Sequence, residues 1–165
     1  MADRPLPYTI AVLCDLRDRD GRVLLIRRAK EPNLGMCSMI GGKLDTAAGE
    51  SPAQCARREI MEEADIDIPL ERLRLVGMVS EQAYLGIGHW LMFIYSVDGP
   101  VEVQPRVIRE GRLEWHAPEE LDSLPQPETD RKVIWPLLRE MQGRFFSVHI
   151  DCTNEEMTWR VEQAE

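Results

Sequence analysis

The sequence predicts one α/β domain in which a mixed β-sheet lies between helices. Strand-like and helix-like segments alternate along the chain, its 165 residues suit a single domain, and no linker or internal repeat divides it. With 44% hydrophobic and 30% charged residues, the composition is that of a globular chain. We therefore expect a single domain over residues 1–165, with a C-terminal β-hairpin extension at about 144–162.

Residues 8–16 and 22–28 are rich in apolar residues and are predicted to pair as a β-hairpin. The turn between them contains Asp20-Gly21, a dipeptide that strongly favours a tight hairpin turn. Residues 36–40 form a further short apolar segment, which Gly41-Gly42 ends. The sheet should therefore begin with a hairpin.

Residues 51–65 carry the signals of an amphipathic helix. Ser51 is a suitable N-cap, Pro52 suits the first helical turn, and Gln54 stands at the third helical position of a capping-box-like start. Apolar residues recur at spacings of three and four, so one face should be buried. The helix is expected to run to about Asp65.

The second half of the chain continues the alternation of strands and helices. The expected elements are strands at 73–79 and 89–97, a strand or turn at 110–115, a short helical segment at 118–121, a helix at 130–142 and a hairpin of 145–150 with 157–161.

Acidic residues outnumber basic ones, which limits the partners that the surface can bind. The chain has 20 Lys and Arg against 29 Asp and Glu, a net charge of −9. Nucleic-acid surfaces need basic clusters, and the longest here are pairs such as Arg27-Arg28, so we expect no nucleic-acid partner. No apolar segment approaches the ~20 residues of a membrane helix, and the first ten residues lack the apolar core of a secretory signal. We expect no membrane contact and a cytoplasmic location.

The cysteines and histidines give no local metal motif. The four cysteines are widely spaced and never form C-x-x-C, which disfavours a zinc site or a redox pair, so buried free thiols are expected. The three histidines are scattered and are expected to be structural or surface residues.

Glu59, Glu62 and Glu63 are predicted to converge on one side of the first helix. At 100° per residue they span an arc of about 100°, with Glu63 beside the apolar face. Like charges cost roughly 1 kcal/mol per pair at about 4 Å in water, and more in a lower dielectric. Arg58 would offset part of this repulsion, and the remaining oxygen ligands suit Mg²⁺. Taken alone, the pattern is also common on solvated helix faces.

The glycine loop and the helix together resemble the Nudix box. That family's pattern is G-x5-E-x7-R-E-U-x-E-E-x-G-U, in which U is a bulky aliphatic residue. This chain matches it in register from Glu50, through Arg58-Glu59-Ile60-Met61-Glu62-Glu63, to Ile66. The segments before and after the box are similar to the family's usual flanks, so the resemblance covers roughly residues 8–142.

Two positions depart from the pattern. Seven residues rather than five separate Gly42 from Glu50, and a loop absorbs such an insertion at little cost. Asp65 replaces the glycine near the end of the box, where a left-handed residue is expected to end the helix at a cost of about 1 kcal/mol for Asp. Neither change removes a metal ligand.

The resemblance implies an enzyme with a Nudix-like α-β-α sandwich that hydrolyses a nucleoside diphosphate linked to another group, X. Glu59, Glu62 and Glu63 would hold Mg²⁺, with Mn²⁺ as a substitute, and the Gly41 carbonyl would add a ligand. Mg²⁺ would bridge the pyrophosphate oxygens and acidify the attacking water. Arg58 would orient the carboxylates. Glu50 would support the loop or bind metal through water.

The resemblance leaves the general base open, because this residue varies within the family. Glu59 is one candidate. Glu110 and Glu114 are others, since family members can draw a catalytic acid from a segment downstream of the box. With Arg58 and Glu62, Glu59 and Glu110 make up the expected catalytic set. The alternative for Glu110 and Glu114 is that both are ordinary surface acids.

Tyr84 and Trp90 are the candidates for stacking on a nucleobase, although aromatic residues in strands more often pack in a core. Tyr84 also stands where some family members that cleave dinucleoside polyphosphates carry a tyrosine. The aromatic residues of the C-terminal hairpin are expected to cover the core or a homodimer interface.

The leading substrate is a nucleoside triphosphate, ordinary or oxidised, cleaved to a nucleoside monophosphate and pyrophosphate. The chain is short and is expected to lack the extra N-terminal domain of many ADP-sugar enzymes. ADP-sugars and dinucleoside polyphosphates are the alternative substrates. A catalytically silent nucleotide-binding module is the rival function, but it would have lost box carboxylates, and all are present here.

Overall fold

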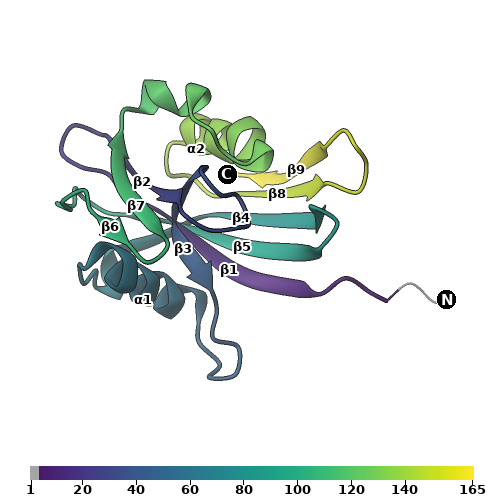
Figure 1. Ribbon diagram of the computed structural model, residues 1–165, viewed down its shortest axis with the longest axis horizontal. Helices are drawn as coiled ribbons and strands as arrows, with labels where there is room; N and C mark the ends of the chain where they lie inside the picture. The colour runs from purple at the N-terminus through teal and green to yellow at the C-terminus, as the bar shows by residue number, and fades with distance from the viewer. Residues whose placement is uncertain (1–3) are drawn as a thin grey trace.

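Nine strands form one sheet in the computed structural model, which describes residues 4–165 (Figure 1). Their order is β6-β7-β2-β3-β1-β5-β4-β8-β9. Along the chain the strands are β1 Tyr8–Asp15, β2 Val23–Arg28, β3 Cys37–Lys43, β4 Leu73–Tyr84, β5 Gly88–Val97, β6 Val107–Ile108, β7 Gly111–His116, β8 Phe146–Asp151 and β9 Thr158–Ala164. β1 is parallel to β5 and β4 to β8, while the other pairs are antiparallel, so the sheet is mixed.

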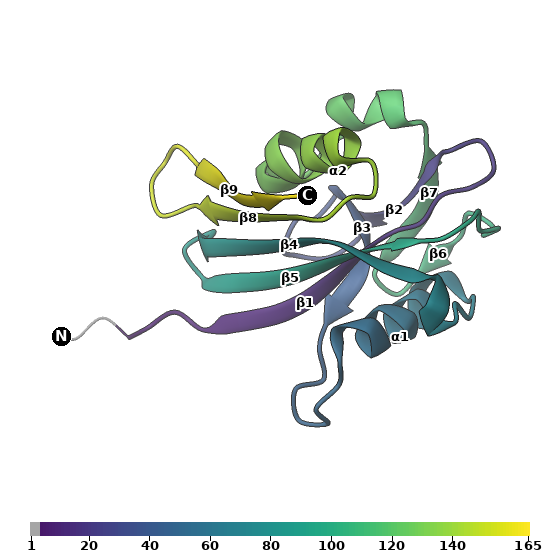
Figure 2. The same ribbon diagram turned by 180° about the vertical axis from the view of Figure 1, so that it is seen from behind.

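Helices cover both faces of this sheet. Figures 1 and 2 show α1 (Pro52–Ala64) below β2 and β3, and α2 (Trp135–Met141) above β4 and β8. A π-helical turn, η3 (Asp130–Ile134), leads into α2, and the 3-10 turns are η1 (Leu70–Arg72) and η2 (Pro118–Ser123). The expected layering of a mixed sheet between helices is confirmed.

Two hydrophobic clusters fill the spaces between the layers. The cluster on the α1 side includes Ile40, Ile60 and Leu113, and the cluster on the α2 side includes Cys37 and Trp135. Each of these five side chains is at most 1% exposed. Burial of both sheet faces explains why β2 is a continuous apolar segment rather than an alternating one.

The expected pairing of the first two strands as a hairpin is wrong. β1 and β2 meet only beside their turn, where Arg17 and Val23 form an isolated bridge. Beyond it β3 lies between them and pairs antiparallel with both. The turn itself forms, with Gly21 at a φ of 77°. Turn chemistry fixes the local reversal but not how far the flanking strands stay together, and a third apolar strand separates them.

The remaining elements differ from expectation mainly in extent. β4 runs five residues past the expected end at position 79, to Tyr84, and the second helix begins as a π turn. The C-terminal hairpin is formed by β8 and β9. Phe146 is fully buried, whereas Trp159 on the edge strand β9 is 47% exposed. Within residues 4–165, no helix has both the length and the apolar character needed to cross a membrane.

Candidate active site

Helix α1 is fixed at both ends by the residues that the sequence indicated. Ser51 Oγ accepts a hydrogen bond from Gln54 N at 3.2 Å, and Gln54 Oε1 accepts one from Ser51 N at 2.9 Å, which completes the capping box. Asp65 ends the helix at a left-handed φ of 58°. Arg106 donates to the carbonyl oxygens of Glu63 and Ala64, which suits a cation at a helix C-terminus. These contacts fix the direction in which the helix presents its glutamates.

Glu59 lies beneath the glycine pair of β3 and is only 9% exposed. A Cβ atom on Gly42 would stand 2.4 Å from the carboxyl carbon of Glu59, so only glycine leaves room for this side chain. Burial raises the pKa of Glu59 above its ordinary value. The second glycine of the pair therefore makes space for a carboxylate.

Glu63 is the most buried acid of the helix, at 5% exposure. Gly41 N donates a hydrogen bond to its Oε2 at 3.1 Å. Burial, with the added repulsion of Glu59 and Glu110, raises the pKa of Glu63 to about 8. Glu62 points to solvent, with 58% of its side chain exposed. Of the three acids, two are therefore buried and one is exposed.

Arg58 holds this cluster together. Its Nε and Nη2 donate to the two oxygens of Glu50 at 2.7 and 2.9 Å, and its Nη1 donates to Glu59 Oε1 at 2.7 Å. Nη1 also lies 3.4 Å from Glu62 Oε1, and Nη2 donates to Lys43 O at 3.1 Å. Hydrogen bonding to Arg58 lowers the pKa of Glu50 to about 2. One guanidinium thus orients three carboxylates, which is the geometry that a planar fork of donors allows.

Glu110 and Glu114 have different surroundings. The negative charge of Glu110 helps to raise the pKa of both Glu59 and Glu63, which places it near the carboxylate cluster. Glu114 instead accepts hydrogen bonds from Arg27 at 3.0 and 3.1 Å and lies 2.8 Å from His116 Nε2. Burial alone would raise the pKa of Glu114, but these partners hold it below its ordinary value. Of the two, only Glu110 is tied to the cluster by these charges.

The two aromatic candidates lie on β4 and β5. Trp90 is half-buried, and Lys43 Nζ stands 5.7 Å from the centre of its ring. The backbone carbonyl of Lys43 accepts a hydrogen bond from Arg58. Lys43 therefore contacts both Trp90, through its side chain, and the arginine that binds the carboxylates, through its backbone. Tyr84 is further removed: its hydroxyl donates to Asn33 Oδ1 at 3.1 Å, in the loop between β2 and β3. Burial raises the pKa of Tyr84 to about 12.

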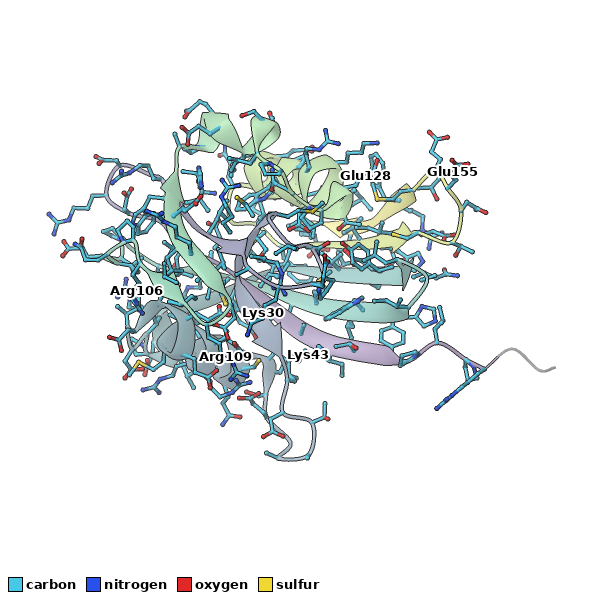
Figure 3. All side chains as sticks on the ribbon, in the orientation of Figure 1. Lys30, Lys43, Arg106, Arg109, Glu128 and Glu155 are labelled. Atoms are coloured by element: carbon cyan, nitrogen blue, oxygen red, sulfur yellow. The ribbon has the colours of Figure 1, made fainter. Side chains whose placement is uncertain are left out.

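Cations around this region were not found by the sequence analysis. Figure 3 labels Lys30, Lys43 and Arg109, whose labels fall around β3 next to α1. Within the part of the chain that the structure describes, none of these three forms an ion pair. Two of them stand next to candidate site residues in the sequence: Lys43 follows Gly42, and Arg109 precedes Glu110. This adjacency was the signal that could have identified them.

The donor set fits a hard divalent cation. It consists of the carboxylate oxygens of Glu59, Glu62 and Glu63, with the Gly41 backbone next to them. Burial, with repulsion between neighbouring carboxylates, raises the pKa of Glu59 and Glu63, and a bound cation would favour their charged forms. Oxygen-only sites of this kind suit Mg²⁺, Mn²⁺ or Ca²⁺.

A model of the NUDIX domain matches residues 7–140. The chain belongs to the Nudix family. Nudix hydrolases are pyrophosphohydrolases that act on phosphoanhydride bonds of nucleoside diphosphates linked to another group, and they generally use divalent metal ions. The resemblance stated from the box residues is therefore confirmed, together with the α/β sandwich that it implied.

The chain is similar to solved Nudix structures over most of its length. A MutT protein from Bacillus halodurans aligns with a TM-score of 0.76 at 24% identity and covers 93% of this chain and 97% of that one. The NUDIX domain of Shewanella oneidensis NrtR, solved with ADP ribose, aligns with a TM-score of 0.66 at 19% identity and covers 84% and 90%. At these identities the likeness shows a shared fold.

Sequence relatives cover smaller parts. The Nudix hydrolase YvcI of Bacillus subtilis, uncharacterized in function, is 27% identical over 117 residues, 70% of each chain. An octanoyltransferase of Myxococcus xanthus is 40% identical over 70 residues, which are 41% of this chain. The aligned segment spans only 19% of the octanoyltransferase.

Proposed function

We propose that this protein is a Mg²⁺-dependent hydrolase of a nucleoside triphosphate, ordinary or oxidised, that releases a nucleoside monophosphate and pyrophosphate. The observation that carries the proposal is the placing of three acids beside the glycine pair of β3: Glu59 and Glu62 contact the Arg58 guanidinium, and Glu63 accepts a hydrogen bond from Gly41 N. A catalytically silent module would not need three acids held in this costly proximity.

In this proposal Glu59, Glu62 and Glu63 would hold the metal, and the Gly41 carbonyl would add a ligand. When bound, Mg²⁺ supplies positive charge to the phosphate oxygens and lowers the pKa of water. Arg58 keeps Glu59 and Glu62 turned toward one another. Both oxygens of Glu50 already accept hydrogen bonds from Arg58, so Glu50 acts as a positioning residue.

Glu110 is the proposed general base. It lies close enough to Glu59 and Glu63 to raise the pKa of both, and it comes from the turn before β7 rather than from the metal-holding helix. A base on a separate element can accept a proton from water while the helix glutamates hold metal. Glu110→Gln should therefore lower kcat, with Mg²⁺ affinity retained.

The substrate would extend from the carboxylates toward β5. Lys43, whose Nζ lies 5.7 Å from the centre of the Trp90 ring, would supply positive charge for the phosphates. Trp90, beside Lys43, would stack on the nucleobase, with Tyr84 at the far end of the same surface.

An ADP-sugar is the second candidate, since the NUDIX domain of NrtR was solved with ADP ribose. A substrate panel distinguishes the two. The purified protein is incubated with nucleoside triphosphates, ADP-sugars and dinucleoside polyphosphates, with Mg²⁺ or Mn²⁺, in ¹⁸O-labelled water. We expect a nucleoside monophosphate and pyrophosphate, and the label marks the phosphorus that is attacked. Release of a sugar phosphate would favour the second candidate, and tight binding without any product would favour a silent module.

A further inference from the structure

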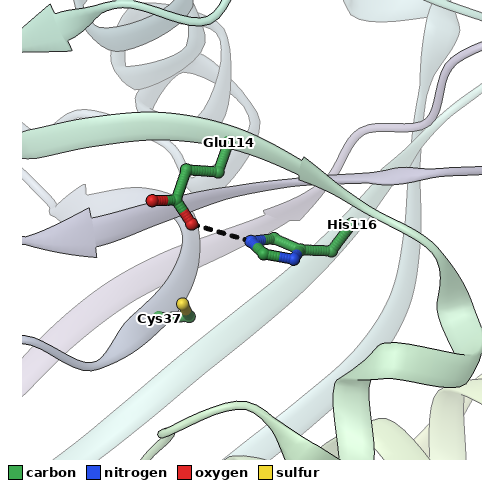
Figure 4. Close-up of side chains that lie close together, drawn as sticks. All are labelled: Cys37, Glu114 and His116. Carbon is green, nitrogen blue, oxygen red and sulfur yellow. Dashed lines mark hydrogen bonds and ion pairs between the residues drawn. The ribbon is translucent and has the colours of Figure 1, made fainter.

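Three residues from distant parts of the sequence lie together on β3 and β7, as Figure 4 shows. Cys37 begins β3, and Glu114 and His116 stand two positions apart on β7. One ligand atom from each residue lies within 4.8 Å of the other two. Because β2 separates β3 from β7, the cluster reaches across three adjacent strands.

This cluster and the glutamates of α1 lie on opposite faces of the sheet. Cys37 belongs to the hydrophobic cluster on the α2 side, whereas Leu113 belongs to the cluster on the α1 side. Side chains alternate along a strand, so Glu114 and His116 face the α2 side with Cys37. The glutamates of α1 are therefore not part of this group.

The separations suit a single metal ion with mixed ligands. His116 Nε2 lies 2.8 Å from Glu114 Oε2, and the Cys37 sulfur completes the group within 4.8 Å. Tetrahedral zinc has ligand bonds of about 2.0–2.3 Å, which puts its ligand atoms roughly 3.4–3.7 Å apart. Small side-chain adjustments bring the three atoms to that spacing.

A second and independent observation is the carboxylate on the outer side of the histidine. His116 Nδ1 lies 3.3 Å from Glu120 Oε2, and Ala117 N fixes the same oxygen by donating to it at 2.9 Å. Histidines that bind metal usually donate their other ring N–H to a carboxylate in this way. In the tautomer that carries its hydrogen on Nδ1, His116 donates to Glu120 and presents Nε2 to Glu114 and Cys37. Arg27 fixes the Glu114 carboxylate from its other side.

We propose that Cys37, Glu114 and His116 bind Zn²⁺, with water in the fourth position, as a site separate from the one that holds Mg²⁺. A sulfur, a nitrogen and an oxygen ligand together suit zinc and not Mg²⁺, which prefers oxygen. On binding, the Cys37 thiol and the His116–Glu114 hydrogen bond each release a proton to solvent, and the sulfur, Nε2 and carboxylate oxygen bond to the metal. The ion ties β3 to β7 and so stabilises the strand that carries Gly41 and Gly42. The spacing of the cysteines, which disfavours zinc in the sequence analysis, reports only on ligands that are neighbours in the sequence and does not test this cluster.

The test uses Co²⁺ as a spectroscopic probe for Zn²⁺, because cobalt bound to a thiolate absorbs strongly in the near ultraviolet. The full chain is titrated with Co²⁺ in excess Mg²⁺, which occupies the oxygen-only cluster, and Zn²⁺ is then added to displace the cobalt. Cys37→Ser and His116→Gln remove ligands, and Cys152→Ser is the matched control. Glu120→Gln tests the outer carboxylate against Glu119→Gln. Circular dichroism shows that each variant is folded.

We expect an absorption that saturates at one cobalt per chain and is reversed by Zn²⁺. It should be absent from Cys37→Ser and unchanged in Cys152→Ser. The His116 side chain is partly exposed, whereas Cys37 is fully buried, so His116→Gln should fold even if Cys37→Ser does not. The test therefore remains valid in that case. Glu120→Gln should weaken binding about 10- to 100-fold. No thiolate absorption in the wild type, or equal absorption in a folded His116→Gln, would overturn the proposal. Hydrolysis is not measured, so failure here is distinct from failure of the proposed function.

Discussion

Replacing Gly42 with alanine should remove activity while the fold persists. The added Cβ would lie 2.4 Å from the carboxyl carbon of Glu59 and 2.4 and 2.6 Å from its oxygens. These atoms are the end of a flexible side chain, so Glu59 can turn away without moving the backbone. Gly42 does not have a positive φ, and alanine therefore adds no backbone strain.

The size of the effect follows from the displacement required. To reach ordinary van der Waals contact, which begins at 3.4 Å, the Glu59 carboxyl carbon must move about 1 Å from its 2.4 Å position. A misplacement of about 1 Å can cost on the order of 100-fold in rate. The displaced carboxylate also loses its 2.7 Å contact with Arg58, a charged hydrogen bond worth roughly 1.5–3 kcal/mol. Solvation of the freed carboxylate offsets part of that loss, so the net change in stability should be smaller.

Gly41→Ala supplies the contrast on the same strand. Its Cβ would lie 2.1 Å from the backbone oxygen of Val12 on β1, which cannot move without opening the sheet. We expect Gly41→Ala to lower Tm strongly. Gly42→Ala should keep a Tm near that of the wild type and lose about 100-fold in kcat.

Urea denaturation and steady-state kinetics with Mg²⁺ measure both variants. Gly88→Ala is the control, because its φ is not positive and its Cβ would come no closer than 3.1 Å to a neighbouring atom. The reasoning is refuted if Gly42→Ala retains wild-type kcat, or if its activity falls only in step with unfolding.

Three further variants test other contacts. Arg58→Lys should lower kcat about 10- to 100-fold, because lysine cannot hold Glu50 and Glu59 together; unchanged kinetics would contradict this. Glu81→Gln should raise Tm more at about pH 8 than at about pH 5. Burial, with the nearby charge of Asp130, raises the pKa of Glu81 to about 7, so its stabilising protonated form is fully present below the unfolded pKa of about 4.3 and is lost as pH rises through about 7. Equal Tm shifts at both pH values would argue against this. Asp65→Gly should raise the free energy of unfolding by about 1 kcal/mol, because φ is 58° there, and denaturation showing no gain would exclude the strain.

The parts of the site that the sequence predicted are local in the chain. The capping box of Ser51 and Gln54, the left-handed Asp65 and the arc of glutamates all follow from positions within one helix. Helix periodicity also placed Glu63 beside the core, where it is found at 5% exposure. Such features depend on neighbours only three or four residues away, so their spacing can be read directly.

Features that depend on strand pairing were not predictable in the same way. The insertion of β3 between β1 and β2 follows from the competition of apolar strands for partners, which no turn residue specifies. The burial of Glu59 required knowledge that Gly42 lies above it. The meeting of Cys37 with His116 depends on β2 bridging two strands that are far apart in sequence.

The central claim, that the carboxylates of α1 hold the metal needed for hydrolysis, is tested most directly with Glu63→Gln. Mg²⁺ binding by calorimetry and turnover of the substrate found in the panel are measured on the same protein preparations. Glu140→Gln, an exposed position on α2, is the matched control. The account predicts weaker Mg²⁺ binding and almost no turnover for Glu63→Gln, with both retained in Glu140→Gln. An unchanged Mg²⁺ titration in a folded Glu63→Gln variant would contradict it.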